Sequence, residues 1–160
     1  GVIILILRPF VIGDYIIENS GKQEGTVVKI DLFYTTLSTV DNRRITVPNG
    51  ALTNSSIVNV TAKDNRKLEI KVGISYQADL KKAKKILETL LHEDASIMSD
   101  QEMQVFVDEL AADSVILGLR AWVKTEEYWA TKWRLNEKIK LTFDEQGIEI
   151  PFPQLDVHIK

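Results

Sequence analysis

The hydrophobic periodicity of this chain changes in kind at the polar stretch of residues 61–67, and that change limits the fold to two different kinds of unit. Before it, residues 14–60 hold only short β-type runs, which are separated by turn residues such as Gly25 and the pair Asp41-Asn42. Five short strands in about 50 residues predict a small, strongly twisted β-barrel. We therefore expect an all-β unit first, with residues 61–67 as the linker to a second unit.

After the linker, strand and helix patterns alternate. The predicted order is a strand at 70–74, a helix that begins at the N-cap Asp79, a hairpin of strands around 103–107 and 115–123, a helix from about 125 that ends at Gly147, and a short strand at 148–150. In the second helix, the residues that we expect on the core face are Trp129, Trp133, Ile139 and Phe143. This order of elements is that of a ferredoxin-like, split βαβ domain.

The chain opens with seven uncharged, mostly apolar residues, 1–7, which run into Arg8-Pro9-Phe10. A helix that spans a bilayer needs about 20 apolar residues, so these seven cannot span a membrane by themselves. The run also lacks the basic leading region and the cleavage site of a signal peptide. Two interpretations remain open on the residues alone: the cut end of a longer apolar segment, or a buried first strand or helix end.

Composition argues against several classes of function. The chain has no Cys, which excludes disulfides and thiol nucleophiles. Its net charge is -3, and residues 8–60 carry five basic and five acidic side chains, so no half has the basic excess of a nucleic-acid binder. His92 and His158 stand far apart without a third metal ligand nearby. With no nucleophile elbow or phosphate-binding loop either, we predict no enzyme, no cofactor site and no metal site.

Short motifs recur through the whole chain in one order and spacing. They are RPF at 8–10, GD at 13–14, GTV at 25–27, TT at 35–36, ITVPNG at 45–50, GISY at 73–76, ELAADSV at 109–115, Trp122, the helix at 133–143, and GIEIPFPQ at 147–154. Together they resemble the cytoplasmic region of the small-conductance mechanosensitive channel family. Any one of them is weak, since the PNG turn alone says only that a strand ends, but the ordered series is specific.

This resemblance implies an α+β fold in four parts. Residues 1–8 would be the cytoplasmic end of a truncated pore-lining transmembrane helix, 9–61 an Sm-like β domain, 62–150 a ferredoxin-like α/β domain, and 151–160 a C-terminal strand. It also implies a homo-oligomer, a heptamer in the family, which reaches the lipid bilayer through upstream transmembrane helices. The implied location is the inner (cytoplasmic) membrane of a bacterium, with this region on the cytoplasmic side.

Three groups of residues acquire roles from the same resemblance. Arg8, Pro9 and Phe10 would couple the pore helix to the β domain, because Pro9 ends the helix and Phe10 can anchor in that domain. Glu69 matches a charged position beside side portals, where it would filter ions; the alternative is an ordinary solvated strand residue. The alternating Leu155, Val157 and Ile159 would form a strand that joins its copies from other subunits in a small barrel.

The implied function is a mechanosensitive ion channel that opens under membrane tension and releases ions and small solutes during hypo-osmotic shock. The rival is a soluble RNA-binding or regulatory module, because Sm-like and ferredoxin-like folds serve many functions. The zero net charge of residues 8–60 and the lack of a stacking platform beside basic residues weigh against the rival, and we expect no nucleic-acid partner.

Overall fold

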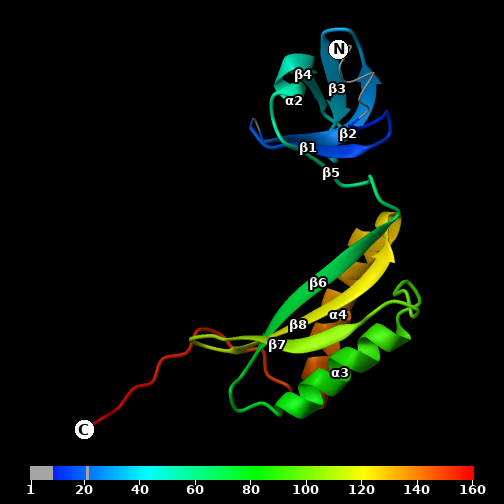
Figure 1. Ribbon diagram of the computed structural model, residues 1–160. Coiled ribbons are helices and arrows are strands. Elements are labelled where there is room, and N and C mark those ends of the chain that lie inside the picture. The colour runs from blue at the N-terminus through cyan, green and yellow to red at the C-terminus, as the bar shows by residue number, and fades with distance from the viewer. Residues whose placement is uncertain (1–8, 21) are drawn as a thin grey trace. The chain divides into compact units, whose positions relative to one another are not determined.

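The chain divides into two units, Gly1–Asp64 and Asn65–Lys160 (Figure 1). The computed structural model describes residues 9–20 and 22–160. Arg8 and the apolar run at 1–7 lie outside the described residues, so the structure does not address the predictions made for residues 1–8. No helix within the described residues is long and apolar enough to cross a bilayer.

The first unit is a five-stranded antiparallel sheet with the strand order β4-β3-β2-β1-β5. Its elements are β1 (Tyr15–Glu18), β2 (Gln23–Ile30), β3 (Tyr34–Ser38), β4 (Arg44–Pro48), the short helix α2 (Asn49–Thr53) and β5 (Ile57–Asn59). The predicted turn at Asp41-Asn42 is confirmed, because Asn42 has a φ of 64°. At Gly25 a Cβ would lie 2.7 Å from the carbonyl oxygen of Ser38, so only glycine allows β2 to approach β3 this closely.

The predicted all-β unit is confirmed, but its sheet is open, so the structure does not show the predicted Sm-like barrel as a closed one. The two edge strands are β4 and β5, and no pairing joins them within the described residues. The chain between them forms α2, and β5 has only three residues, which pair with β1. The core consists of Phe10, Ile16, Val27, Leu37, Val47 and, from α2, Leu52. Leu52 of α2 thus adds to the core next to the edge strand β4, which would be paired in a closed barrel.

The second unit combines a three-stranded antiparallel sheet with two helices. Its elements are β6 (Asn65–Ile74), α3 (Leu80–Glu93), β7 (Gln104–Leu110), β8 (Val115–Lys124), the 3-10 turn η1 (Thr125–Glu127) and α4 (Tyr128–Gln146). Strand β8 lies between β6 and β7 (Figure 1). One core holds alternate residues of the strands together with the apolar stripes of both helices, including Leu68, Ile70, Leu87, Leu91, Leu117, Leu119, Leu135 and Ile139. The opposite face of the sheet carries the intervening residues.

Two predictions for the second unit are wrong, the extent of the linker and the last strand. The predicted linker, 61–67, overlaps β6, because Asn65 already pairs with Lys124 and the guanidinium of Arg66 stacks 3.7 Å from the ring centre of Tyr128. The predicted strand at 148–150 is absent, so the four-stranded ferredoxin-like sheet is incomplete. The N–H of Ser75 donates to the carbonyl of Glu149 at 2.9 Å and the N–H of Ile148 to that of Phe143 at 2.8 Å, but no ladder forms, and Pro151 lacks the donor that a longer ladder would need.

The inner face of α4 agrees with the prediction at Ile139 and Phe143 and differs from it at Trp129 and Trp133. Its buried residues are Thr131, Leu135, Ile139 and Phe143, whereas 53% of Trp129 and 64% of Trp133 is exposed. Trp129 and Trp133 are each two residues from Thr131, which is about 200° around a helix. Because Thr131 faces the core, both tryptophans face outward. They contact each other with their ring centres 5.9 Å apart. The predicted ends are confirmed: the side chain of Asp79 caps α3, and Gly147 ends α4 with a φ of 75°.

Residues 151–160 form no strand in the single chain, and all of them are described. Leu155, Val157 and Ile159 are exposed, and the nearest hydrogen bond to the rest of the unit runs from the N–H of Gln154 to the carboxylate of Asp113 at 3.2 Å. The alternating pattern has no neighbouring strand here to pair with. That this segment pairs with copies of itself stays a prediction.

Candidate functional site

The segment that leads into the first unit is anchored at Pro9 and at Phe10. Phe10 is 2% exposed and lies in the core with Ile16 and Val27. The carbonyl of Pro9 accepts a hydrogen bond of 3.2 Å from the side-chain amide of Asn59, at the end of β5. Of the three residues predicted to couple the pore helix to this domain, these two are placed, and Arg8 lies outside the described residues.

Asp14 fastens this leading segment to the last residues of the unit. Its carboxylate accepts hydrogen bonds from the backbone N–H of Val11 at 2.9 Å, the amide of Asn59 at 3.0 Å and the hydroxyl of Thr61 at 2.8 Å. The hydrogen bond from Val11, helped by the two side-chain donors, holds the pKa of Asp14 below its ordinary value against the opposing effect of burial. The GD motif at 13–14 carries no sequence signal for this role beyond the family resemblance. The structure shows that its carboxylate bonds to positions 45 and 47 residues away.

Asn49 is a second anchor that the sequence did not reveal. It is 2% exposed, and its amide donates to the carbonyls of Asp31 at 2.8 Å and Leu32 at 3.0 Å. Its side-chain oxygen accepts the hydroxyl of Thr35 at 2.7 Å. The middle residue of the PNG motif therefore holds the turn between β2 and β3, in addition to ending β4. Its hydrogen-bond partner Thr35 is the first residue of the TT motif at 35–36, which is the only sequence feature that pointed to this contact.

Glu69 lies on β6, on the sheet face opposite the helices, and is ion-paired. Its carboxylate is 2.5 Å from Nε of Arg120 on β8 and 3.7 Å from Nζ of Lys71, which is also 3.3 Å from the carboxylate of Asp108 on β7. The hydrogen bond from Arg120 lowers the pKa of Glu69. Glu69 therefore carries its negative charge within a cluster of two carboxylates and two cations.

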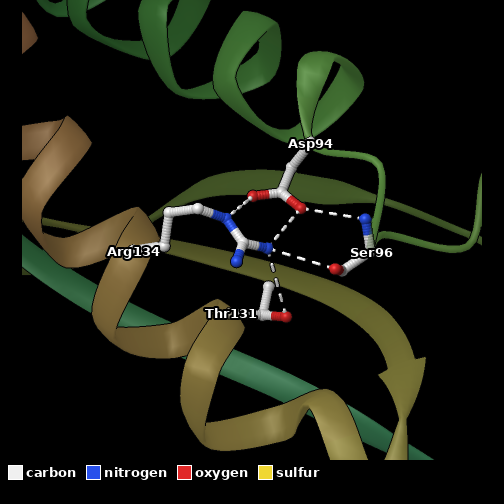
Figure 2. A network of polar contacts seen from close by, with 4 residues as sticks. All are labelled: Asp94, Ser96, Thr131 and Arg134. Atoms are coloured by element: carbon white, nitrogen blue, oxygen red, sulfur yellow. Dashed lines mark hydrogen bonds and ion pairs between the residues drawn. The ribbon is translucent and has the colours of Figure 1, made fainter.

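A separate network closes the end of α3 against α4 (Figure 2). The guanidinium of Arg134 donates to both oxygens of Asp94, at 2.9 and 2.8 Å, and to the hydroxyl of Ser96 at 3.1 Å. The side chain of Asp94 is only 1% exposed. Burial acts to raise its pKa, but the hydrogen bonds from Arg134 and from the backbone of Ser96 outweigh burial, and the pKa is lowered. This arrangement is suited to stabilising the packing of α3 against α4, since its polar groups hydrogen-bond to one another.

Comparisons with known proteins fit this two-unit arrangement. The family model described as the mechanosensitive ion channel beta-domain matches residues 1–62, and the model of the MscS C-terminal region matches residues 68–150. The chain belongs to the MscS family of mechanosensitive ion channels. The family recognised from the motifs is thereby confirmed, and it is a family of membrane channels rather than of enzymes.

Individual MscS-family proteins match the chain from end to end. The small-conductance mechanosensitive channel of Edwardsiella ictaluri is 36% identical over 99% of this chain and 55% of its own length. That of Helicobacter pylori is 34% identical over 100% of this chain and 58% of its own length. The crystal structure of Helicobacter pylori MscS in its closed state superposes with a TM-score of 0.91 at 32% identity, over 100% of this chain and 63% of that one. The chain thus spans about half the length of the curated relatives that it matches.

The remaining predicted positions belong to different units and segments of the chain. Glu69 belongs to the second unit and the Pro9–Phe10 anchor to the first, while Leu155, Val157 and Ile159 lie exposed near the C-terminus. No group of three potential metal ligands occurs within the described residues.

Proposed function

We propose that this chain is the cytoplasmic region of a channel that opens under membrane tension and releases ions and small solutes during hypo-osmotic shock. The observation that carries the proposal is the consecutive match of both MscS family models, which together cover nearly the whole chain. Because the relatives extend well beyond it, the proposal includes upstream transmembrane helices in the lipid bilayer, with residues 1–8 as the end of the pore helix. The alternative of a soluble RNA-binding or regulatory module is not favoured by these matches.

The proposed assembly is a homo-oligomer, a heptamer as the resemblance implies, in the inner membrane of a bacterium. Its cytoplasmic side would hold a β domain at 9–61, an α/β domain at 62–150 and a C-terminal strand at 151–160. The exposure of Leu155, Val157 and Ile159, which pair with nothing in the single chain, supports a strand completed by other subunits. Glu69 would lie beside the side portals and influence which ions pass.

Tension would act by favouring the state of larger in-plane area, in which the pore helices tilt apart and the apolar constriction wets. The first unit would receive this motion through residues 8–10. Phe10 is suited to transmit it because its ring is packed into the core, and Pro9 is hydrogen-bonded to Asn59. Through Asp14 the same segment is tied to Thr61, at the boundary with the second unit. The motion would therefore reach a position 47 residues further along the chain.

Phe10→Ala in the full-length channel tests this coupling. We expect an altered tension threshold and altered inactivation, because the pore helix would lose its apolar anchor. Since a Phe→Ala change in a core also costs about 3 to 5 kcal/mol, Asn59→Ala provides a second variant that loosens Pro9 without emptying the core. Val11→Ala is the matched control, because Val11 is 50% exposed on the same segment. Patch recordings with threshold and inactivation unchanged in both test variants would show that the coupling role is wrong.

A further inference from the structure

The sheet face opposite the helices in the second unit carries a charged cluster that joins all three strands. Along β6, Leu68 and Ile70 point into the core, so Glu69 and Lys71 point to the opposite face. Arg120 lies directly across from Glu69 in the register of β6 with β8. Asp108 completes the cluster from β7 through its ion pair with Lys71. These four side chains are 28 to 53% exposed, so ions in solution can approach them.

The charges of this cluster cancel. Contacts run from Arg120 to Glu69 at 2.5 Å, from Glu69 to Lys71 at 3.7 Å and from Lys71 to Asp108 at 3.3 Å. Two cations thus alternate with two carboxylates. An ion that approaches Glu69 meets Arg120 at almost the same distance, because the paired atoms are so close. The carboxylate alone therefore does not set the potential at this surface.

Arg120 is held in this position by an aromatic support. Its guanidinium carbon lies 4.7 Å from the ring centre of Phe106 on β7. That ring occupies the space beside Gly118, which faces both Lys71 and Phe106 in the sheet register. A Cβ at position 118 would lie 2.5 Å from two ring atoms of Phe106, so any larger residue would force the ring to move. Glycine at 118 thus leaves room for the ring that supports Arg120.

We propose that Arg120 is a specificity-determining residue of the channel, which neutralises Glu69 and so sets the balance between cations and anions at this face. This inference rests on the proposed function, in which Glu69 lies where ions pass. Removing Arg120 exposes an unbalanced carboxylate and favours cations, whereas removing the charge of Glu69 leaves an unbalanced guanidinium and favours anions. The two substitutions have effects of opposite sign, and the double substitution restores a balanced cluster. A purely structural pair would not give this pattern.

The test measures reversal potentials of tension-activated currents across a KCl gradient, using the full-length channel. With Arg120→Gln we expect the cation-to-anion permeability ratio to rise about twofold, the size expected from one unbalanced charge that salt screens over about a Debye length. With Glu69→Gln we expect a fall of similar size, and with both substitutions a return toward the unmodified ratio. Lys140→Gln, which removes the same charge from an exposed pair on α4, is the matched control with no shift expected.

A second variant separates position from charge. Gly118→Ala changes no charge but displaces the Phe106 ring, so we expect a shift in the same direction as Arg120→Gln and smaller than it. If Arg120→Gln yields no current, Glu69→Gln and Gly118→Ala carry the test. Shifts of the same sign for Arg120→Gln and Glu69→Gln, or no shift in any variant of a channel that still opens under tension, would overturn the role of Arg120. A full-length protein without tension-activated current would overturn the proposed function as well.

Discussion

Two ion pairs in the second unit combine an arginine with a carboxylate in opposite surroundings. Arg134 binds Asp94, whose side chain is 1% exposed, between α3 and α4. Arg120 binds Glu69, whose side chain is 35% exposed, on the uncovered face of the sheet. A buried carboxylate depends on its partner because water cannot replace it, whereas a half-exposed one can be solvated. The difference indicates that the first pair maintains the fold and that the second shapes the field at a surface.

Breaking the buried pair has the largest expected effect. We expect Arg134→Ala to lower the free energy of unfolding by about 3 kcal/mol, because Asp94 would remain buried without its two strongest donors. Urea unfolding of this chain at neutral pH, followed by circular dichroism, measures the loss. Lys140→Ala is the matched control, since its pair with Asp144 is exposed and should contribute no more than about 0.5 kcal/mol. Equal losses in the two variants would remove the distinction between buried and exposed pairs.

The same pair should make stability depend on acid. The pKa of Asp94 is lowered from its ordinary 3.8, so the pair's contribution is complete above that pH and is lost as pH falls through the folded-state pKa. We expect the stability difference between the unmodified chain and Arg134→Ala to be largest where Asp94 is ionised in both folded proteins, and to shrink in acid as Asp94 is protonated first in the variant and then in the unmodified chain. Urea unfolding at a series of pH values checks this. A difference that persists undiminished into strong acid would contradict the assigned interaction.

The exposed pair should have the smallest effect on stability. We expect Glu69→Gln and Arg120→Gln each to change the free energy of unfolding by less than about 1 kcal/mol, because water can solvate whichever partner remains. The same urea unfolding provides the measurement. A loss as large as that of Arg134→Ala would place Glu69 and Arg120 among the groups that hold the fold, and any change in permeability would then have a structural origin.

Elements with strong local signals were predictable from the sequence. The N-cap Asp79 and the glycine that ends α4 depend on residues close along the chain, and both are confirmed. The mixed α+β fold with antiparallel sheets also agrees with the MscS structure. By contrast, hydrophobicity alone placed Trp129 in the core, although the buried position near it belongs to Thr131. Size and apolarity do not determine which side of a helix faces the sheet.

The interactions that sequence analysis missed join residues far apart in the chain. Arg134 reaches Asp94 across 40 residues, Arg120 reaches Glu69 across 51, and Asn59 reaches Pro9 across 50. No spacing rule connects such pairs, because the packing of helices and the register of strands that bring them together are properties of the folded unit. The open edges of the first sheet and the absence of a strand at 148–150 likewise depend on which strands pair in the folded unit. The periodicity of one segment does not contain that information.

Patch recording from membranes that contain the full-length protein tests the central claim most directly. Expressed in cells without other mechanosensitive channels, it should give unitary currents that appear at a reproducible suction below the rupture of the patch and disappear when suction is released. Patches that remain silent up to rupture, or currents that do not depend on suction, would contradict the assignment of this chain to a tension-gated channel.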